Sequence, residues 1–288
     1  MENKKYIDFH MHSTYSDGDL TPSQLMSLAA YRGLDIVALS DHDTVRGYPE
    51  AKKQGNRYGL VVIPGVEITT PKYHLLSLGF NPDDKQFIEF LKHSEALQRQ
   101  ACSIRITKLQ EIGIPITMEK IDRDFPNARL GKKNIFTALM TDRECWGYFR
   151  DTYPDVNPRD IFLKYFGHNG VASDIKDRPA VSVDEAIYQV HKAGGIIGIA
   201  HPVKDVEDMK ELEILVEKGI DFMEIQPRFK DKKFEQWARE HNLPTTYGSD
   251  YHGPTMTREM LTREDNVLSP ELEDIIPAGL LERNKVFI

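Results

Sequence analysis

Five short apolar segments of the chain are each followed, within four residues, by residues whose side chains can bind metal ions. The segments cover residues 6–9, 36–39, 60–63, 196–199 and 245–247. The residues that follow them are His10, His12, Asp41, His42, Asp43, Glu67, His201, Asp250 and His252. Apolar runs of this length, bounded by polar residues, are typical of buried strands. The recurrence restricts the chain to folds in which these strand ends meet.

The pair His10 and His12 shows why a strand end suits metal binding. Side chains two residues apart on a strand point to the same side. Both imidazoles are therefore expected to face one spot, and Asp250 and His252 repeat this spacing. The sequence thus predicts a metal centre, and metal-dependent hydrolysis is the leading functional hypothesis.

The order of elements predicts an α/β barrel. Strands are expected near residues 5–12, 35–41, 60–69, 73–80, 196–200, 221–226 and 244–248. The helix after the first strand is expected to begin at Thr21, an N-cap residue followed by proline. Alternation of strands and helices implies parallel strands joined by crossover helices. Residues 1–82 and 182–288 are predicted to form this barrel.

The middle of the chain, residues 83–181, has a different pattern. Helices are expected near 83–112, 119–124, 134–141 and 158–166, and no strong strand run interrupts them. We interpret this part as an inserted helical subdomain that caps the substrate. The polar tail after residue 253 is expected to be irregular.

Composition sets limits on partners and location. The 288 residues carry a formal charge of −8, which disfavours a stable complex with nucleic acid. No apolar stretch approaches the roughly 20 residues of a membrane span. The first residues run straight into a strand pattern, which leaves no room for a signal peptide. Cys102 and Cys145 lack metal or redox spacing, so reduced thiols in a cytoplasmic protein are expected, with one disulfide as the alternative.

A set of nine residues at expected strand ends could ligate metal. Its members are His10, His12, Asp17, His42, Glu67, His74, His201, Asp250 and His252. In barrel enzymes the chemistry gathers at the carboxyl ends of the strands. Two members have simpler alternative interpretations: Asp17 as a turn residue, and His74 as an ordinary strand residue.

The motifs that carry these residues resemble those of the polymerase and histidinol phosphatase (PHP) family. They are His10-x-His12, Ser13-Thr14-x-Ser16-Asp17-Gly18, Leu39-Ser40-Asp41-His42-Asp43, Gly65-Val66-Glu67, Ala200-His201-Pro202 and Gly248-Ser249-Asp250-x-His252. Within the family, the chain is most similar to small phosphoesterases such as nucleoside 3',5'-bisphosphate phosphatase and AMP phosphatase. The resemblance implies a distorted (β/α)7 barrel that resembles a TIM barrel and holds two to three divalent metals.

The same resemblance distributes the ligands by position. One metal is expected to take His10, His12, Glu67 and Asp250. A second is expected to take Glu67, His74 and His201, and a third Asp17, His42 and His252. Three divalent ions and three carboxylates leave a charge of about +3, which suits a phosphate monoester dianion. Imidazole and carboxylate ligands suit manganese, iron or zinc.

The implied chemistry is hydrolysis of phosphate monoesters of small molecules such as nucleoside monophosphates or 3',5'-bisphosphates. A hydroxide bridging two metals is expected to attack phosphorus in line. Asp43 and His252 are candidates for delivering a proton to the leaving group. Asp43 could instead orient a metal ligand, and both roles remain open.

Substrate recognition is expected from basic residues of the helical insertion: Arg99, Arg105, Lys132 and Lys133. Each could also be an ordinary solvated charge on a helix. Asn134 stands where the bisphosphate phosphatases are expected to have histidine, so their specificity is less well supported than the metal chemistry.

Alternative functions fit parts of the pattern. A histidinol-phosphate phosphatase or a nuclease of the same family would use the same ligands. An amidohydrolase-type C–N hydrolase also begins with a His-x-His strand but usually needs fewer ligands. A regulatory module with a decayed site would lack ligands, and none of the nine is missing.

Overall fold

The chain forms two compact units. The computed structural model describes residues 4–153, 157–167, 170–173, 175, 178–228, 232–254, 259–263, 266–277 and 279–281. The barrel unit comprises Met1–Ser94 and Val181–Ile288, and the helical unit comprises Glu95–Ala180. The helical unit thus begins inside a helix rather than at the sequence-based boundary of residue 83. Its role as a substrate cap stays a prediction.

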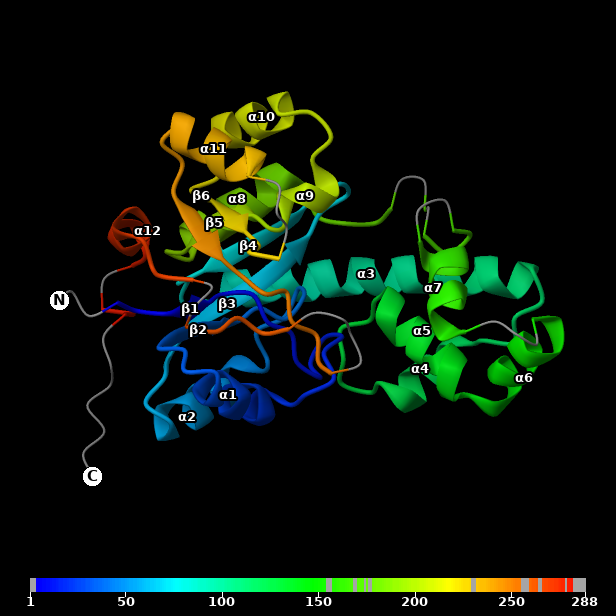
Figure 1. Cartoon of the computed structure of the whole chain (residues 1–288). Coiled ribbons are helices and arrows are strands. Elements are labelled where there is room, and N and C mark those ends of the chain that lie inside the picture. Colours follow the sequence, from blue (N-terminus) through cyan, green and yellow to red (C-terminus); the bar gives the residue numbers. More distant parts are fainter. Residues whose placement is uncertain are drawn as a thin grey trace. The chain divides into compact units, whose positions relative to one another are not determined.

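A seven-stranded sheet, ordered β1 to β7, forms the centre of the barrel unit (Figure 1). The strands are β1 (Ile7–Asp8), β2 (Ile36–Leu39), β3 (Val61–Thr69), β4 (His74–Leu78), β5 (Ile196–Ile199), β6 (Phe222–Ile225) and β7 (Thr245–Tyr247). Each lies within a segment predicted to be a strand. The α/β barrel predicted from the sequence is confirmed.

Strand β4 departs from the expected parallel arrangement. It pairs antiparallel with both β3 and β5, whereas the other neighbouring strands pair parallel. Only residues 70–73 connect β3 to β4, and the Thr70 N–H donates to the Tyr73 carbonyl at 3.0 Å across that turn. A link this short forms a hairpin, because a parallel crossover needs a dozen or more residues. The expectation of uniformly parallel strands was therefore wrong for β4.

Backbone hydrogen bonds between the segments at β1 and β7 nearly close the sheet into a barrel. The Phe9 N–H donates to Tyr247 O at 3.1 Å, and the Asp250 N–H donates to His10 O at 2.8 Å. Beyond the strand ends, the His12 N–H donates to Tyr251 O at 2.9 Å. Closure joins the segment after β1 to the segment after β7, and both carry candidate metal ligands.

Helices cover the outside of the barrel. They are α1 (Pro22–Tyr31), α2 (Tyr48–Arg57), α8 (Val183–Lys192), α9 (Pro202–Asp205), α10 (Lys210–Lys218) and α11 (Lys233–Glu240). Figure 1 shows α1 and α2 beside β1 and β2, with α8, α10 and α11 on the side of β5 and β6. Helix α1 begins as predicted, because Thr21 and Gln24 exchange side-chain-to-backbone hydrogen bonds in a capping box.

The tail after residue 253 contains one more helix, α12 (Pro270–Ile275). Ser269 caps it, and Leu268, Leu272 and Ile276 are buried in the same apolar cluster as Ile7 of β1. Leu272 lies within α12, and Leu268 and Ile276 lie at its two ends. The expectation of an irregular tail was therefore wrong for this segment, because a short capped helix was overlooked among its polar residues.

The helical unit has its own apolar core. Its helices are the later part of α3 (Lys85–Glu111), then α4 (Met118–Asp124), α5 (Lys132–Thr141), α6 (Arg143–Thr152) and α7 (Pro158–Phe166). Helix α6, capped by Asp142, was not predicted. Buried side chains such as Leu109, Leu139 and Phe149 meet in one cluster. As predicted, the described residues of this unit contain no strand.

Two further sequence-based expectations concern the whole chain. Cys102 and Cys145 are free, buried thiols, so the alternative of a disulfide is wrong. Burial raises the pKa of Cys102 to about 11 and that of Cys145 to about 12. Over the described residues, every helix is too short or too polar to cross a membrane. The cytoplasmic location stays a prediction.

Candidate metal centre

Glu67 in β3 is the central residue of the candidate site. It is fully buried. Its Oε2 atom lies 3.0 Å from His10 Nε2, 3.2 Å from His12 Nε2 and 3.1 Å from His42 Nδ1. Its Oε1 atom lies 2.9 Å from His74 Nδ1 and 2.8 Å from His201 Nε2. Five imidazoles from the ends of four strands thus surround one carboxylate.

The first candidate ligand group comprises His10, His12, Glu67 and Asp250, all buried. Asp250 Oδ1 lies 3.4 Å from His12 Nε2 and 3.8 Å from His10 Nε2. Ligand atoms bound at about 2.0–2.2 Å to one ion lie roughly 3–4 Å apart, depending on the coordination geometry, so these spacings suit a common cation. The group coincides with the first ligand set implied by the sequence.

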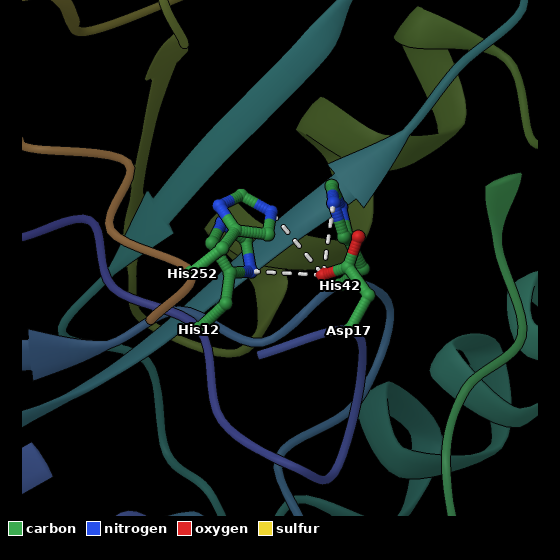
Figure 2. A group of neighbouring side chains, drawn as sticks. All are labelled: His12, Asp17, His42 and His252. Carbon is green, nitrogen blue, oxygen red and sulfur yellow. Dashed lines mark ion pairs between the residues drawn. The ribbon is translucent and has the colours of Figure 1, made fainter. Parts of the chain in front are cut away.

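The second candidate group surrounds Asp17, as Figure 2 shows. Asp17 Oδ1 lies 3.3 Å from His252 Nε2, 3.9 Å from His42 Nε2 and 4.0 Å from His12 Nδ1. His12 joins the three residues expected from the sequence, because its two ring nitrogens face Glu67 and Asp17. The ring nitrogens of His42 also face these two carboxylates.

The third candidate group is His42, Glu67 and His74. The resemblance had implied His201 in place of His42. His201 does reach Glu67, but it does so on the same oxygen atom that contacts His74. The structure thus brings all nine predicted residues together, and their division among three ions stays a prediction.

The titration of these groups reflects their mutual proximity. Burial alone would raise the pKa of Glu67, but the charges of His42, His10 and His74 outweigh burial and hold that pKa well below its usual value. Burial opposes protonation of His12, yet contacts with Asp250 and Glu67 raise its pKa to about 9. A divalent ion would compete with protons for these ligand atoms.

Several buried atoms of the cluster make no hydrogen bond within the described part of the chain. They are His10 Nε2, both ring nitrogens of His12, Asp17 Oδ1 and Glu67 Oε2. Leaving buried polar atoms without hydrogen bonds costs about 1–3 kcal/mol each. Their lone pairs converge at ligand spacing, so the residues present fit divalent cations.

The ring orientation of two histidines is fixed from the side away from the cluster. His10 Nδ1 lies 2.7 Å from Glu224 Oε1, and His252 Nδ1 lies 2.9 Å from the Asp250 carbonyl. Each Nδ1 is placed to donate its proton, which leaves the Nε2 lone pair directed at the cluster. Partners of this kind set the tautomer of metal-binding histidines.

The backbone is strained at the same place. Asp43, His201 and Asp250 have positive φ angles of 49°, 31° and 54°. Residues with a Cβ atom adopt this left-handed region at a cost of about 1–3 kcal/mol, and such strain gathers at functional sites. Three of the four described non-glycine residues with this geometry belong to the motifs of the candidate site.

The loop that carries Asp17 is held by Asp41. Asp41 accepts hydrogen bonds from the Ser13 N–H at 2.7 Å and from the hydroxyls of Ser13 and Ser16 at 2.6 Å each. A Cβ atom at Gly18 would lie 2.2 Å from the His12 carbonyl oxygen. Asp41 stood in a quoted motif without an assigned role, and its role is to shape this loop.

Asp43 and His252, the two candidates for proton delivery, occupy different surroundings. His252 belongs to the group around Asp17. Asp43 is fully buried, and its Oδ1 atom accepts hydrogen bonds from the Thr69 N–H and the Ser94 hydroxyl, both at 2.8 Å. These contacts favour the interpretation that Asp43 orients its neighbours. The role of each residue in proton transfer stays a prediction.

Sequence reasoning missed two cations beside the cluster. Lys204 of α9 binds Asp250 Oδ2 at 2.5 Å, and an Arg228 nitrogen lies 3.5 Å from the same oxygen. Both side chains are about one-third exposed. Lys204 and Arg228 each follow a strand end within a few residues, and this position could have identified them. Neither is a metal ligand, so the pattern of ligand residues did not include them.

The predicted substrate-binding residues of the helical unit have mixed surroundings. Arg99 is exposed and paired with both carboxylate oxygens of Asp122, at 2.7 and 2.6 Å. Lys132 donates to the Ser173 hydroxyl at 3.1 Å. Asn134 caps α5 by accepting the Gly131 N–H at 2.7 Å. These contacts give Arg99 and Asn134 structural roles, and substrate binding by all of them stays a prediction.

Arg105 is the exception in the helical unit, because it is buried. Its Nε donates to the Ala172 carbonyl at 3.1 Å, and no carboxylate of the described residues pairs with it. Burial and the charges of Arg178 and Arg129 lower the pKa of Arg105 to about 10. Arg129 is also buried and was not predicted. Lys133 is half-buried.

A barrel-like sheet with buried histidines and carboxylates at its strand ends defines a metal-dependent hydrolase. The PHP domain model matches residues 8–120. The chain is 32% identical over 263 residues to a 5'-3' exoribonuclease of Haemophilus influenzae, covering 87% of this chain and 91% of that protein. The chain therefore belongs to the PHP family and is a metal-dependent phosphoesterase of that family, as the sequence motifs predicted.

Other relatives carry other activities in their names. A phosphoribosyl 1,2-cyclic phosphate 1,2-diphosphodiesterase of Eggerthella lenta is 30% identical, covering 85% of this chain and 94% of its own. A 3',5'-nucleoside bisphosphate phosphatase of Chromobacterium violaceum is 28% identical, covering 86% and 87%. The names of all three relatives refer to hydrolysis of a phosphate ester, but the ester differs among them.

Solved structures share the fold. One assigned as a metal-dependent phosphoesterase from Bifidobacterium adolescentis matches with a TM-score of 0.77 and 24% identity over 94% of this chain and 96% of its own. One named as an amidohydrolase from Chromobacterium violaceum, with bound sulfate, matches with a TM-score of 0.76 and 25% identity over the same shares. These similarities support the distorted barrel.

Proposed function

We propose that this enzyme hydrolyses phosphate monoesters of nucleotides, either nucleoside monophosphates or 3',5'-bisphosphates. The observation that carries the proposal is the cluster of six histidines and three carboxylates, with Glu67 at its centre. The Chromobacterium violaceum relative named as a bisphosphate phosphatase supports the substrate class. Two to three ions of manganese, iron or zinc suit the donor set.

The proposed ligands are assigned to separate metal ions. His10, His12, Glu67 and Asp250 would hold one ion, and Asp17, His42 and His252 another. His74 and His201 would complete a third position at Glu67. When bound, the ions supply Lewis-acid activation of water and neutralisation of phosphoryl charge. Lys204 and Arg228, next to Asp250, add positive charge that would attract a phosphate dianion.

Substrate choice is proposed to depend on the helical unit. Arg105 is buried, has no carboxylate partner among the described residues, and is acted on by the charges of two other arginines. Guanidinium groups bind phosphate through directed, charge-assisted hydrogen bonds. We therefore propose that Arg105 contributes most to substrate choice within the helical unit, and we propose lesser roles for Lys132 and Lys133. The cytoplasmic location, where nucleotides are abundant, is part of the proposal.

A second candidate function is exonucleolytic hydrolysis of RNA from the 5' end. It is favoured by the Haemophilus influenzae relative, which is named for that activity. The net charge of −8 predicted no stable complex with nucleic acid, and that expectation remains untested. Successive hydrolysis of short RNA would need only transient binding.

A substrate panel on the metal-loaded protein tests these proposals. Purified protein would be stripped, reloaded with manganese, iron or zinc, and analysed for metal content. The panel contains nucleoside monophosphates, 3',5'-bisphosphates, histidinol phosphate, a cyclic phosphodiester and a short 5'-phosphorylated RNA. We expect the highest kcat/KM for a nucleotide monoester. Shortening of the RNA with little phosphate release would favour the second function, and inactivity with every metal would reject both.

A further inference from the structure

Three polar residues on and after β6 contact residues of the candidate metal centre. Its members are Glu224, Gln226 and Arg228, spaced two residues apart. Glu224 and Gln226 are buried, and Arg228 is partly exposed. None of them belongs to the nine proposed ligands. Burial of a carboxylate is costly unless its oxygens accept hydrogen bonds, so the partners of Glu224 indicate its role.

Both oxygens of Glu224 are engaged by residues that carry candidate ligands. Oε1 lies 2.7 Å from His10 Nδ1, and Oε2 accepts the backbone N–H of His201 at 2.6 Å. The first contact fixes the tautomer and the ring orientation of His10. The second fixes the backbone of His201, which stands in the left-handed region.

Gly248 makes the contact with His10 possible. A Cβ atom at this position would lie 1.9 Å from Glu224 Oε1 and 2.4 Å from His10 Cβ. No larger residue fits without moving one of the two groups. The glycine of the Gly248-Ser249-Asp250 segment is therefore explained by the approach of Glu224 to His10.

Gln226 and Arg228 connect Glu224 to Asp250 through a series of contacts. Gln226 donates to Glu224 Oε2 at 3.3 Å and accepts from Arg228 at 2.7 Å. Arg228 donates to the Ser249 carbonyl at 2.6 Å and lies 3.5 Å from Asp250 Oδ2. The series of contacts begins at His10 and ends at Asp250, and both belong to the first candidate ligand group.

We propose that Glu224, Gln226 and Arg228 are positioning residues that hold His10, His201 and Asp250 in the geometry that binds metal. This inference rests on the proposed metal centre. Glu224 is not itself proposed as a ligand. Its Oε1 contacts His10 Nδ1, the ring nitrogen directed away from the cluster, and its Oε2 accepts the backbone N–H of His201. The three residues act on metal affinity through the orientation of the ligands.

The test is manganese binding by the metal-free protein, measured by calorimetric titration for the wild type, Glu224→Gln and a control. An amide at residue 224 keeps the volume but can accept from only one of His10 and His201. We expect manganese affinity to fall roughly 10- to 100-fold, as for other partners of metal-binding histidines. The control, Glu235→Gln on α11, removes an acid that pairs with Arg239, and we expect wild-type affinity.

A second readout does not depend on metal. Nitrogen-15 spectra of the imidazole rings report the ring N–H groups and their hydrogen bonds. We expect a hydrogen-bonded Nδ1–H on His10 in the metal-free wild type, whether or not Nε2 is protonated, and weakening of that hydrogen bond in Glu224→Gln. A merely structural role would lower the melting temperature and leave both this hydrogen bond and the metal affinity of the folded protein unchanged.

The outcomes separate this inference from the proposed function. If the wild type takes up no manganese, iron or zinc, the proposed function fails. If the wild type binds manganese and Glu224→Gln binds it within about twofold, the positioning role is overturned while the metal centre stands. If Glu224→Gln does not fold, Gln226→Met and Arg228→Met replace it, each with an expected loss of about 10-fold. Unchanged affinity in both would overturn the inference equally.

Discussion

The two units of the molecule bury charges of opposite sign. Among the described residues, the buried acids all lie in the barrel unit: Asp8, Asp41, Asp43, Glu67, Glu224 and Asp250. The buried arginines, Arg105 and Arg129, both lie in the helical unit. Buried charge needs a compensating partner. Among the described residues, the two units thus differ in the charge that they bury, carboxylates in the barrel unit and guanidinium groups in the helical unit.

The two units also differ in how their charges are arranged. In the barrel, closure of the sheet forces the ends of different strands to one place, so acids and histidines distant in sequence converge on Glu67. In the helical unit, charges sit on helices whose exposed faces point to solvent. Arg99 and Arg105 are both on α3, yet the first is exposed and the second is buried. Spacing alone therefore identifies a site more reliably in the barrel.

The largest expected effect comes from breaking the centre of the barrel site. Glu67→Gln replaces the carboxylate that faces five imidazoles with an uncharged amide. We expect loss of bound metal and a fall in turnover of roughly 10²-fold or more, because activation of the nucleophile depends on that metal. Elemental analysis and kinetics at saturating manganese measure both effects.

The matched control for that variant is again Glu235→Gln, which loses the same charge on an exposed helix. Its turnover and metal content should equal those of the wild type. Normal turnover in Glu67→Gln, with full metal content, would show that the cluster is not the metal centre and would break the contrast between the two units.

The second prediction isolates the cost of burying an acid in the barrel. Asp8 accepts hydrogen bonds from the Ser249 N–H at 3.0 Å and the Leu261 N–H at 3.3 Å. Burial outweighs these bonds and raises the pKa of Asp8 from 3.8 to about 6. The folded protein therefore binds this proton more tightly than the unfolded chain does. Its contribution to stability is present below pH 3.8 and is lost as the pH rises through 6.

Asp8→Asn removes that titration. We expect the free energy of unfolding of the wild type, relative to Asp8→Asn, to fall by about 2 kcal/mol between pH 4 and pH 6.5. Urea unfolding of both metal-free proteins across this range measures the difference. A difference that stays constant with pH would mean that Asp8 is ionised throughout and that burial is not its dominant influence.

The third prediction concerns the buried arginine of the helical unit. Arg105→Met keeps an unbranched stem and removes the guanidinium. We expect kcat/KM for a bisphosphate to fall roughly 10- to 100-fold, mainly through KM, because a charge-assisted contact contributes about 1.5–3 kcal/mol. A small aryl phosphate, which has no second phosphate, should lose much less. Equal losses for both substrates would assign Arg105 to the structure of the unit.

The sequence predicted the barrel site well because strand period and strand ends are local signals. His10 and His12 needed only a two-residue spacing, and Glu67 needed only the apolar run before it. The antiparallel direction of β4 could have been predicted from the number of residues between β3 and β4. Residues 70–73 are too few for the crossover that a parallel pair needs. Glu224 was missed because it belongs to none of the motifs that were identified, and its place in β6 does not by itself separate a buried partner from an exposed side chain.

The helical unit was predicted less well for a physical reason. Helical charges carry no constraint that brings them together, and their burial depends on tertiary packing. Arg129 lies outside the helices and became buried only through the fold of the unit. Asn134 was identified from a family pattern, but its local role is to cap α5. Such roles require coordinates.

The smallest expected effect sharpens this contrast at Arg99. Arg99 and Arg105 were predicted alike to bind substrate, but Arg99 is paired with Asp122 at the surface. Exposed pairs contribute about 0.2–1 kcal/mol to stability. We therefore expect Arg99→Met to change the free energy of unfolding by no more than that and kcat/KM for a bisphosphate by less than about twofold. A tenfold loss of kcat/KM would mean that Arg99 leaves Asp122 to bind substrate, and burial would then not distinguish the arginines that recognise phosphate.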